Sequence, residues 1–581
     1  MRTLAVVLCL LLPAAGPDAR AQTEPAQTRP APTQPKRTEL TRAELLDPES
    51  KVVEVHARAF LPIGKAQARE RFEGSLDFGA VRGQAKFGNP LAKKWKLRRL
   101  PLWRASFTSV DGYLVPFERE LIVDQSSDCA WNLVLSPGRI WSEKSDHGWS
   151  RASFPLLLAN KLTNGCLECV ATFVYKSGKV SDLHLQVLEE TWPEFSTSMT
   201  ARLRLTWQSR SMPEHEVVRK DFRKELATML PRARLSDLAD EHRGFDLAAF
   251  SRGLRLSHLR QAAVLHRGTL YVQDLRKPAE AFPFPRFQRH GAYSLTKSMG
   301  LGLAMLRLAE LYGPEIYQAK LVDHIDAGKH RKAWASVRFG DCLDMATGLD
   351  WPDRTGDDKP RYDEDCPRFR KWLLAWGRDK KLGLALDQQS IGTDPGRVFR
   401  YQTVASFLLA TALTDWLQKK RGKTTDLGDF LRDEVFAPIG IQHMPIMRTI
   451  ETDGRRGQVI LGYGLYPSLE DLAHVALLLQ DEGVWKGHRL LHKASLERAL
   501  YRGRAQGLPT SVPSPAGEIR YLASFWGLPF RSRGETFIAP YMSGHGGNAL
   551  LLVPGGPAYL RFLDSSQYQL VPMLHQLLKL R

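Results

Sequence analysis

Ser294 and Lys297 are the two residues of this chain whose types and spacing most directly suggest chemistry. They lie in Ala292-Tyr293-Ser294-Leu295-Thr296-Lys297-Ser298, which opens an apolar run over 299–311 with the pattern of an amphipathic helix. Residues three apart share a helix face, so the hydroxyl and the amine can meet. An amine held at a helix N-terminus and away from water favours its neutral form and can take the serine proton. The pair predicts a serine nucleophile with a lysine base.

Two later segments place polar groups directly before apolar elements. Phe399-Arg400-Tyr401-Gln402-Thr403 precedes an apolar helix over 404–417, and Ser543-Gly544-His545-Gly546-Gly547-Asn548 precedes a strand-like run over 549–553. A Ser-x-x-Lys match alone occurs by chance in most long chains, where it usually marks a capped helix with a solvent-facing lysine. The order of the three segments is therefore the informative feature.

In this order the segments resemble the penicillin-recognising serine hydrolases, in particular the branch of class C β-lactamases, related esterases and 6-aminohexanoate-dimer hydrolases. That family has Ser-x-x-Lys, then Tyr-x-Asn or a variant, then Lys-Thr-Gly or His-x-Gly. The intervening segments match as well: 337–349, ending in Thr-Gly-Leu, the turn in 435–441, and 462–473. The resemblance covers roughly residues 245 to 581.

The resemblance implies how the reaction proceeds. Ser294 attacks an ester or amide carbonyl and becomes acylated. Lys297 accepts the proton and returns it, together with Tyr401 if neighbouring positive charge partly ionises its phenol. His545 hydrogen-bonds near Tyr401 or the substrate, and water then releases the acyl group. We expect Ser294, Tyr401 and His545 to face one cleft, with the three reacting side-chain atoms within hydrogen-bond reach.

The resemblance also implies a substrate-binding set. The backbone N–H groups of Ser294 and Asn548 are expected to form the oxyanion hole, and Gly546 and Gly547 to allow close approach to the backbone. Thr403 stands where the family has Asn or Ser, so a shorter hydroxyl must bind the substrate amide or the bond is lost.

His545 stands where many relatives have the lysine that reads the carboxylate of β-lactams. The changes from the family pattern at Thr403 and at His545 both favour an esterase or amidase over an efficient β-lactamase. The alternatives are a D-amino-acid peptidase, carboxypeptidase or β-lactamase acting on peptidoglycan-type substrates, and a non-catalytic envelope-binding protein. No metal-ligand pattern is present, and we expect no metal and no cofactor.

The elements that must position these residues follow from the rest of the chain. The expected catalytic domain, 245–581, has an α/β (α+β) β-lactamase-like fold with an antiparallel central sheet and a helical subdomain. Short alternating strands over 43–212 predict a β-rich sandwich or barrel of unknown role. The polar segment 213–244 is expected to be a linker.

The N-terminus predicts export. Residues 1–21 have the charge, apolar core and small-x-small end of a signal peptide. Residues 22–42 are rich in Pro, Gln and Thr and predict a disordered tether. No later run is apolar enough for a transmembrane segment. We expect a periplasmic or secreted protein.

Charge and cysteines complete the expectations. The formal net charge is +19, but Lys and Arg are scattered and no nucleic-acid-binding motif accompanies them. We therefore expect a small-molecule or peptide-like ester or amide substrate, no nucleic acid, and association with the anionic cell envelope as an open possibility. In an oxidising compartment, disulfides between Cys342 and Cys366, and from Cys129 to Cys166 or Cys169, are conceivable.

Overall fold

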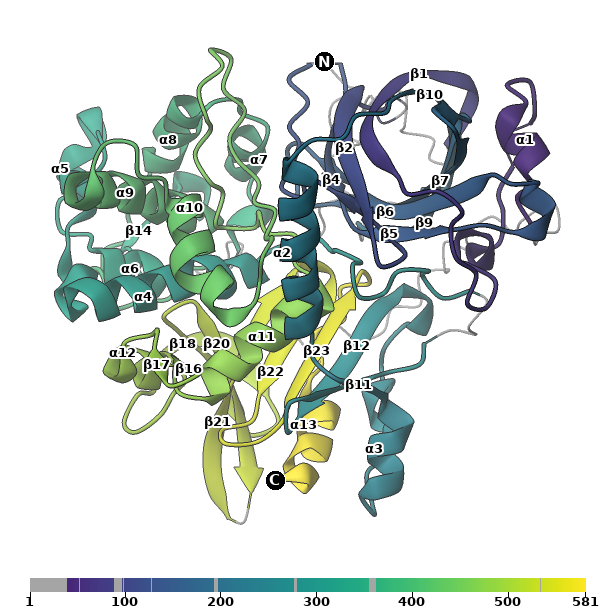
Figure 1. Cartoon of the computed structure of the whole chain (residues 1–581). Coiled ribbons are helices and arrows are strands. Elements are labelled where there is room, and N and C mark those ends of the chain that lie inside the picture. Colours follow the sequence, from purple (N-terminus) through teal and green to yellow (C-terminus); the bar gives the residue numbers. More distant parts are fainter. Residues whose placement is uncertain are drawn as a thin grey trace.

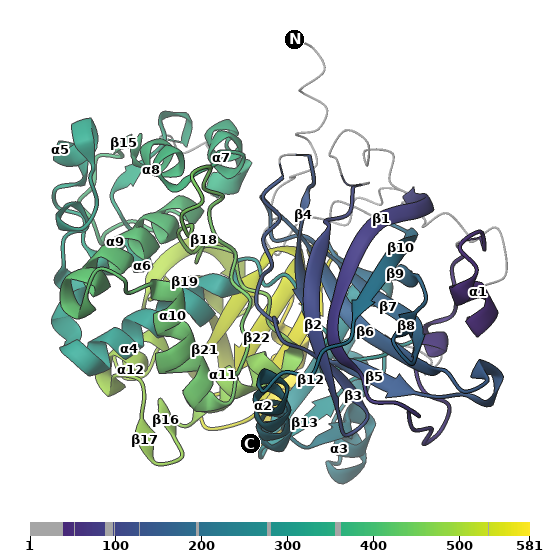
Figure 2. The same cartoon turned by 45° about the horizontal axis from the view of Figure 1, so that its top comes forward.

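The computed structural model describes residues 39–51, 53–87, 97, 99–126, 128–192, 197–275, 280–354, 362–532 and 534–581. The predicted signal peptide and most of the predicted tether lie outside the described residues. The end of the tether runs into helix α1 (Arg42–Leu46), which Thr41 caps. A barrel and a helical subdomain stand side by side on a central sheet (Figures 1 and 2).

The N-terminal part is a closed antiparallel barrel. Its strands follow the order β6-β5-β3-β2-β1-β10-β9-β7, and pairing of β7 with β6 closes the ring, while β4 and β8 pair with β6 and β7. Alternate residues of β2, namely Trp103, Ala105 and Phe107, belong to the apolar interior, as the period of a strand requires. Closure removes the exposed sheet edges. The strands are β1 (Glu73–Phe87), β2 (Trp103–Val110), β3 (Tyr113–Pro116), β4 (Trp131–Leu135), β5 (Gly138–Trp141), β6 (Ser150–Asn160), β7 (Cys166–Lys176), β8 (Lys179–Val180), β9 (Leu183–Thr191) and β10 (Met199–Gln208).

The central sheet has the order β11-β13-β12-β23-β22-β21-β20-β19-β18 and is antiparallel except between β11 and β13. Along β12, Ala262 and Val264 pack with helices α3 and α13, whereas Ala263 and Leu265 pack with α4 and α11 on the other face. Its elements are β11 (Arg232–Arg234), α3 (Leu235–Glu241), β12 (Leu259–His266), β13 (Thr269–Val272), α4 (Leu303–Tyr312), α11 (Leu469–Gln480), β18 (Leu508–Ser514), β19 (Gly517–Leu522), β20 (Phe525–Ser532), β21 (Glu535–Gly544), β22 (Asn548–Leu552), β23 (Ala558–Leu563) and α13 (Val571–Leu577).

The helical subdomain is built around α9, which is buried on nearly every side from Thr403 to Leu413 and is therefore a core helix rather than an amphipathic one. The other elements of this region are α5 (Arg331–Trp334), α6 (Phe339–Leu343), β14 (Leu349–Asp350), α7 (Pro367–Leu373), α8 (Arg378–Leu386), β15 (Gln389–Ser390), α9 (Thr403–Arg421) and α10 (Leu427–Leu431), with β16 (Val484–Trp485), β17 (His488–Arg489) and α12 (Lys493–Ala499) following along the chain. The predicted fold class is confirmed, and the N-terminal part is a barrel.

Two expectations about connections need revision. Residues 213–244 contain helix α2 (Glu214–Thr228), strand β11 and helix α3, so part of the expected linker belongs to the central sheet. The disulfides considered above do not form in the structure. The five described cysteines are buried free thiols: Cys129, Cys166, Cys169, Cys342 and Cys366.

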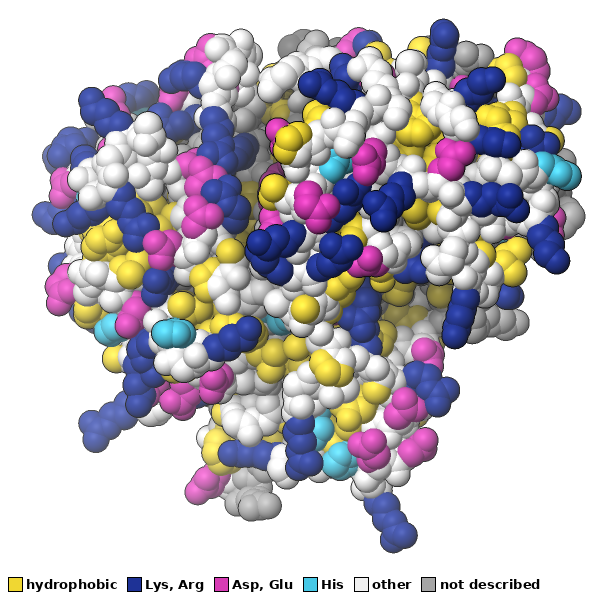
Figure 3. Space-filling view, viewed as in Figure 1, with side chains coloured by type: hydrophobic (Ala, Val, Ile, Leu, Met, Phe, Trp, Pro, Cys, Tyr) yellow, Lys and Arg dark blue, Asp and Glu magenta, His cyan; other side chains and the backbone are white. Residues whose placement is uncertain are grey.

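The described helices and one face of the surface bear on the expected partners. In the part of the chain that the structure covers, no helix is both long and apolar enough to cross a membrane. On the face in Figure 3, Lys and Arg side chains are spread among acidic ones over all three parts of the molecule.

Candidate active site

Ser294 lies in a sharp turn at the start of the helix that runs along the central sheet. A π-helical segment, Lys297–Gly302, follows it and continues into α4. Tyr293, directly before the serine, has a φ of +49°, which a bulky residue rarely adopts. Such a conformation persists only where neighbouring contacts hold it, and it is typical of functional sites. The turn presents the serine hydroxyl to a pocket.

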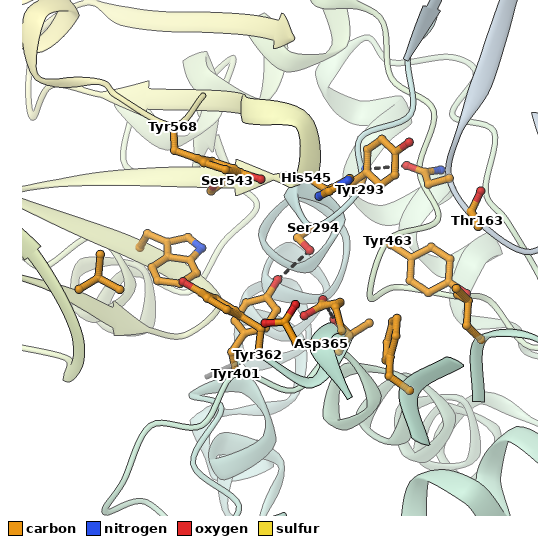
Figure 4. A pocket seen from close by; sticks show the side chains of 18 of the residues that line it. Thr163, Tyr293, Ser294, Tyr362, Asp365, Tyr401, Tyr463, Ser543, His545 and Tyr568 are labelled. Atoms are coloured by element: carbon orange, nitrogen blue, oxygen red, sulfur yellow. Dashed lines mark hydrogen bonds between the residues drawn. The ribbon is translucent and has the colours of Figure 1, made fainter. Parts of the chain in front are cut away.

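The structure brings the three predicted reacting side chains together. Lys297 Nζ lies 2.9 Å from Ser294 Oγ, and Tyr401 Oη donates to the same oxygen at 2.7 Å (Figure 4). Both distances lie within hydrogen-bond reach. Lys297 Nζ also donates to Thr403 Oγ1 and to the backbone oxygen of Gly462, each at 2.9 Å. When Lys297 is neutral, the Ser294 hydroxyl can donate to Nζ instead.

Burial sets the protonation of the two candidate bases. It lowers the pKa of Lys297 to about 8, although the charges of Glu364 and Asp363 oppose this shift. It raises the pKa of Tyr401 well above its ordinary value, and the charge of Glu364 adds to the rise. The direction of this shift opposes the expected partial ionisation of Tyr401, even though Lys297 Nζ lies 4.7 Å from the centre of its ring. Lys297 is the base that the geometry and charge favour, and Tyr401 is a hydrogen-bond donor.

Glu364 is a residue of the site that the motifs did not reveal. Thr403 Oγ1 donates to Glu364 Oε1 at 2.6 Å, so the carboxylate reaches Lys297 through one hydroxyl. This occupies Thr403, which was expected to bind substrate. Glu364 belongs to Asp363-Glu364-Asp365. Three consecutive acidic residues are a visible signal, but only the fold shows which carboxylate points toward the lysine.

Replacing Glu364 by glutamine is expected to shift the pH dependence of turnover. The negative charge of Glu364 raises the pKa of Lys297, so its removal lets that pKa fall further below about 8. Because the base must be neutral, the acid limb of kcat/KM moves to lower pH, by about one unit. Glutamine keeps an acceptor for Thr403. Ester turnover against pH measures the shift, with Glu497→Gln on exposed α12 as control; an unmoved limb contradicts the coupling.

Only the first half of the segment from Ser543 to Asn548 reaches the pocket. Ser543, Gly544 and His545 line the pocket, whereas Gly546, Gly547 and Asn548 are not among the described lining residues. A Cβ on Gly544 would lie 2.3 Å from the Ala292 backbone oxygen, so only glycine allows β21 to approach the nucleophile turn this closely. The imidazole of His545 packs edge-to-face against Tyr293, with ring centroids 5.3 Å apart. Among the described hydrogen bonds of Tyr401 none goes to His545, and the expected contact of His545 with the substrate stays a prediction.

The side chain of Asn548 has a structural role, because it hydrogen-bonds to backbone groups of neighbouring segments. Its amide donates to the backbone oxygens of Gly291 and His545, each at 3.1 Å, and its carbonyl accepts from Leu563 N at 2.9 Å. Gly547 has a φ of +96°, and a Cβ there would lie 2.4 Å from the Gln567 backbone oxygen. The oxyanion hole formed by the backbone of Ser294 and Asn548 stays a prediction.

The barrel supplies part of the site, which no sequence signal suggested. In the loop between β6 and β7, Asn164 Oδ1 accepts from the Tyr293 N–H at 2.5 Å. Tyr293 Oη donates to the backbone oxygen of Thr191 at 2.8 Å, at the end of β9. Thr163 and Asn164 line the pocket (Figure 4). The contacts that hold the residue before the nucleophile therefore come from the N-terminal domain.

The pocket above Ser294 is aromatic, with an internal volume of about 210 Å³. The ring of Tyr401 stacks on Trp526 at 5.8 Å, and Tyr362 lies edge-on to Tyr401 at 5.2 Å. Its lining comprises Thr163, Asn164, Tyr293, Ser294, Tyr362, Glu364, Asp365, Phe369, Leu373, Tyr401, Thr403, Tyr463, Val512, Ile519, Trp526, Tyr541, Ser543, Gly544, His545 and Tyr568.

One protein family matches the part of the chain that holds these motifs. Residues 258–575, more than half of the chain, match the family described as Beta-lactamase. No curated protein matches the chain.

Several solved structures are similar to the chain. A protein described as a 6-aminohexanoate-dimer hydrolase, from Bacillus anthracis, has 18% identity and a TM-score of 0.41, covering 55% of this chain and 76% of that one. A penicillin-binding protein homologue from Caulobacter crescentus has 17% identity and a TM-score of 0.36, covering 55% and 92%. A D-stereospecific amidohydrolase from Streptomyces sp. has 13% identity and a TM-score of 0.37, covering 55% and 95%.

Proposed function

The chain belongs to the β-lactamase family of serine hydrolases, and on that premise we propose that it cleaves an ester or amide bond through an acyl-enzyme on Ser294. The observation that carries this proposal is the contact of one serine oxygen with both a buried lysine amine and a buried phenol, at 2.9 and 2.7 Å. A nucleophile within reach of a base with a lowered pKa is what acyl transfer requires.

In the proposed reaction Ser294 Oγ bonds to the substrate carbonyl carbon while its proton passes to Lys297 Nζ. The carbonyl oxygen becomes an oxyanion. Collapse of this tetrahedral intermediate breaks the bond to the alcohol or amine, which leaves with the proton that Lys297 held. Water then adds to the acyl-enzyme and restores Ser294. Neutral Tyr401 assists as a hydrogen-bond donor to Oγ and to the departing group.

The pocket favours an esterase or amidase over a β-lactamase or a D-amino-acid carboxypeptidase. A β-lactam or a peptide terminus carries a carboxylate, which is usually read by a cation. Among the described residues that line this pocket, none is lysine or arginine, and His545 is the basic one. We further propose that the enzyme works in the periplasm or outside the cell, on the basis of residues 1–21.

Covalent labelling tests the proposal. The wild-type protein is expected to gain the mass of one fluorophosphonate adduct, Ser294→Ala to gain none, and benzylpenicillin to label the wild type far more slowly. Intact-mass spectrometry measures all three. Labelling that persists in Ser294→Ala would contradict the assigned nucleophile. Rapid penicillin labelling would support the peptidoglycan-type alternative, and no adduct with either probe would favour a non-catalytic envelope-binding protein.

A further inference from the structure

The charged side chains in and behind the pocket wall indicate which kind of substrate the pocket can bind. Beneath the floor, Lys297 faces Glu364 through Thr403. Behind the wall, the fully buried guanidinium of Arg354 lies 3.2 Å from Asp350 Oδ1. Each of these two cations therefore has a carboxylate partner, and neither has a charge left over for a ligand.

Asp365 is the remaining charge at the pocket wall. It lines the pocket, and it comes from the same loop as Tyr362 (Figure 4). Within the described part of the chain, no hydrogen bond or ion pair engages its carboxylate. Burial and the charge of Glu364 raise the pKa of Asp365 to about 6, while Arg354 and His545 oppose the rise. Asp365 is thus ionised above that pH.

Asp363, beside it, is not among the described residues that line the pocket. Its buried carboxyl accepts from Val404 N at 3.1 Å, and burial with the adjacent charge of Glu364 raises its pKa well above the ordinary value. Although the whole chain has a formal net charge of +19, the wall of its pocket carries a carboxylate, Asp365, that has no ion-pair partner among the described residues.

Aromatic rings surround this carboxylate. Tyr362, Tyr401 and Trp526 form a continuous set of ring contacts along one wall, and Tyr541 extends it by stacking on Trp526 at 6.2 Å. The faces of aromatic rings attract cations, and the attraction grows when the cation is desolvated. An apolar cavity with one free carboxylate is suited to an organic ammonium group and unsuited to an anion.

We propose that this pocket selects esters or amides whose apolar acyl group carries a positively charged amine or quaternary ammonium, with Asp365 as the residue that determines the selection. The inference rests on the proposed function, since the cation is placed by its attachment to the carbonyl that Ser294 attacks. The carbonyl lies at the serine and the ammonium lies among the rings beside Asp365. A carboxylate at the same place would be repelled and left without a partner.

Three matched substrates test the proposal at a pH above the pKa of Asp365. They are p-nitrophenyl butanoates whose terminal carbon bears a trimethylammonium, a tert-butyl or a carboxylate group. The expected kcat/KM of the trimethylammonium ester exceeds that of the tert-butyl ester about tenfold, and that of the carboxylate ester about a hundredfold. In Asp365→Asn the preference for the cation over the neutral ester falls to about threefold, the share that the rings provide.

Asp379→Asn is the matched control, because Asp379 is exposed on α8 and does not line the pocket. It is expected to keep the wild-type ratios. A second measurement needs no variant: phenyltrimethylammonium should inhibit wild-type hydrolysis of the neutral ester at concentrations where benzoate does not.

The two proposals fail in different ways. Equal turnover of the three esters, or faster turnover of the carboxylate ester, would overturn the selection by Asp365 while leaving the serine hydrolase intact. Turnover of none of the esters would overturn the proposed function and, with it, the inference that rests on it.

Discussion

Replacing Lys297 by methionine is expected to lower kcat for a neutral ester by about 10³-fold while the protein stays folded. The amine contacts Ser294 Oγ at 2.9 Å, and a positioned general base contributes roughly 10²–10⁴-fold to such a reaction. Methionine has a similar volume and no charge, so it fills the buried site without a desolvation cost. Steady-state kinetics and the rate of fluorophosphonate labelling measure the loss, and circular dichroism checks the fold.

The chain offers a second buried lysine as a control. Lys381 Nζ donates to the backbone oxygens of Trp372 and Leu373, at 2.8 and 3.0 Å, at the C-terminus of α7. This is the ordinary structural use of a cation at a helix end. Lys381→Met is expected to reduce thermal stability and to keep kcat within a few-fold. Fluorophosphonate labelling of Lys297→Met at the wild-type rate would show that Lys297 is not the base.

The central residues of the site could be predicted from the sequence, because they are either close together in the chain or belong to motifs that follow one another in a fixed order. Ser294 and Lys297 are three residues apart at a helix start, and helical spacing alone brings their side chains together. The order of the motifs predicts Tyr401, which lies two residues before the start of α9 at Thr403. The two faces of β12 follow from the alternation of a strand between two layers.

What the sequence could not reveal depends on contacts between distant segments. Burial raises the pKa of Tyr401, and so does the charge of Glu364, which lies 37 positions earlier in the chain and comes near the phenol only in the fold. The prediction of disulfides was wrong for a similar reason, because the spacing of cysteines along the sequence does not fix the distance between their sulfur atoms in the fold. The Lys, Arg and Glu content of 213–244 predicts a linker, but Val218, Phe222 and Leu226 recur at helical spacing along α2 and pack against the barrel.

Replacing Asn164 by alanine is expected to lower kcat about 10²-fold with little change in KM. Asn164 Oδ1 accepts from the N–H of Tyr293, whose φ is +49°. Without this acceptor Tyr293 can relax toward a common conformation, and the adjacent Ser294 then moves relative to Lys297 and Tyr401. A displacement of about 1 Å at the reacting atoms can cost 10²-fold. Asn164→Asp keeps an acceptor oxygen and is expected to recover much of the rate.

A matched variant separates positioning from stability. Asn132 is a buried barrel asparagine on β4 whose Oδ1 accepts from Asp124 N at 3.2 Å. Asn132→Ala is expected to lower the melting temperature without the loss in kcat. If Asn164→Ala loses stability but keeps kcat, or if Asn164→Asp recovers nothing, the role of Asn164 in holding the nucleophile turn is wrong.

The same contacts determine what the barrel does. Its loop reaches so close to the nucleophile turn that a Cβ on Gly291 would lie 2.0 Å from the backbone oxygen of Asn164. Tyr463, which also lines the pocket, donates to the Leu162 oxygen at 3.2 Å. An isolated catalytic domain, 245–581, would lack every one of these partners. The barrel is thus better understood as a structural half of the active site than as a separate module attached to it.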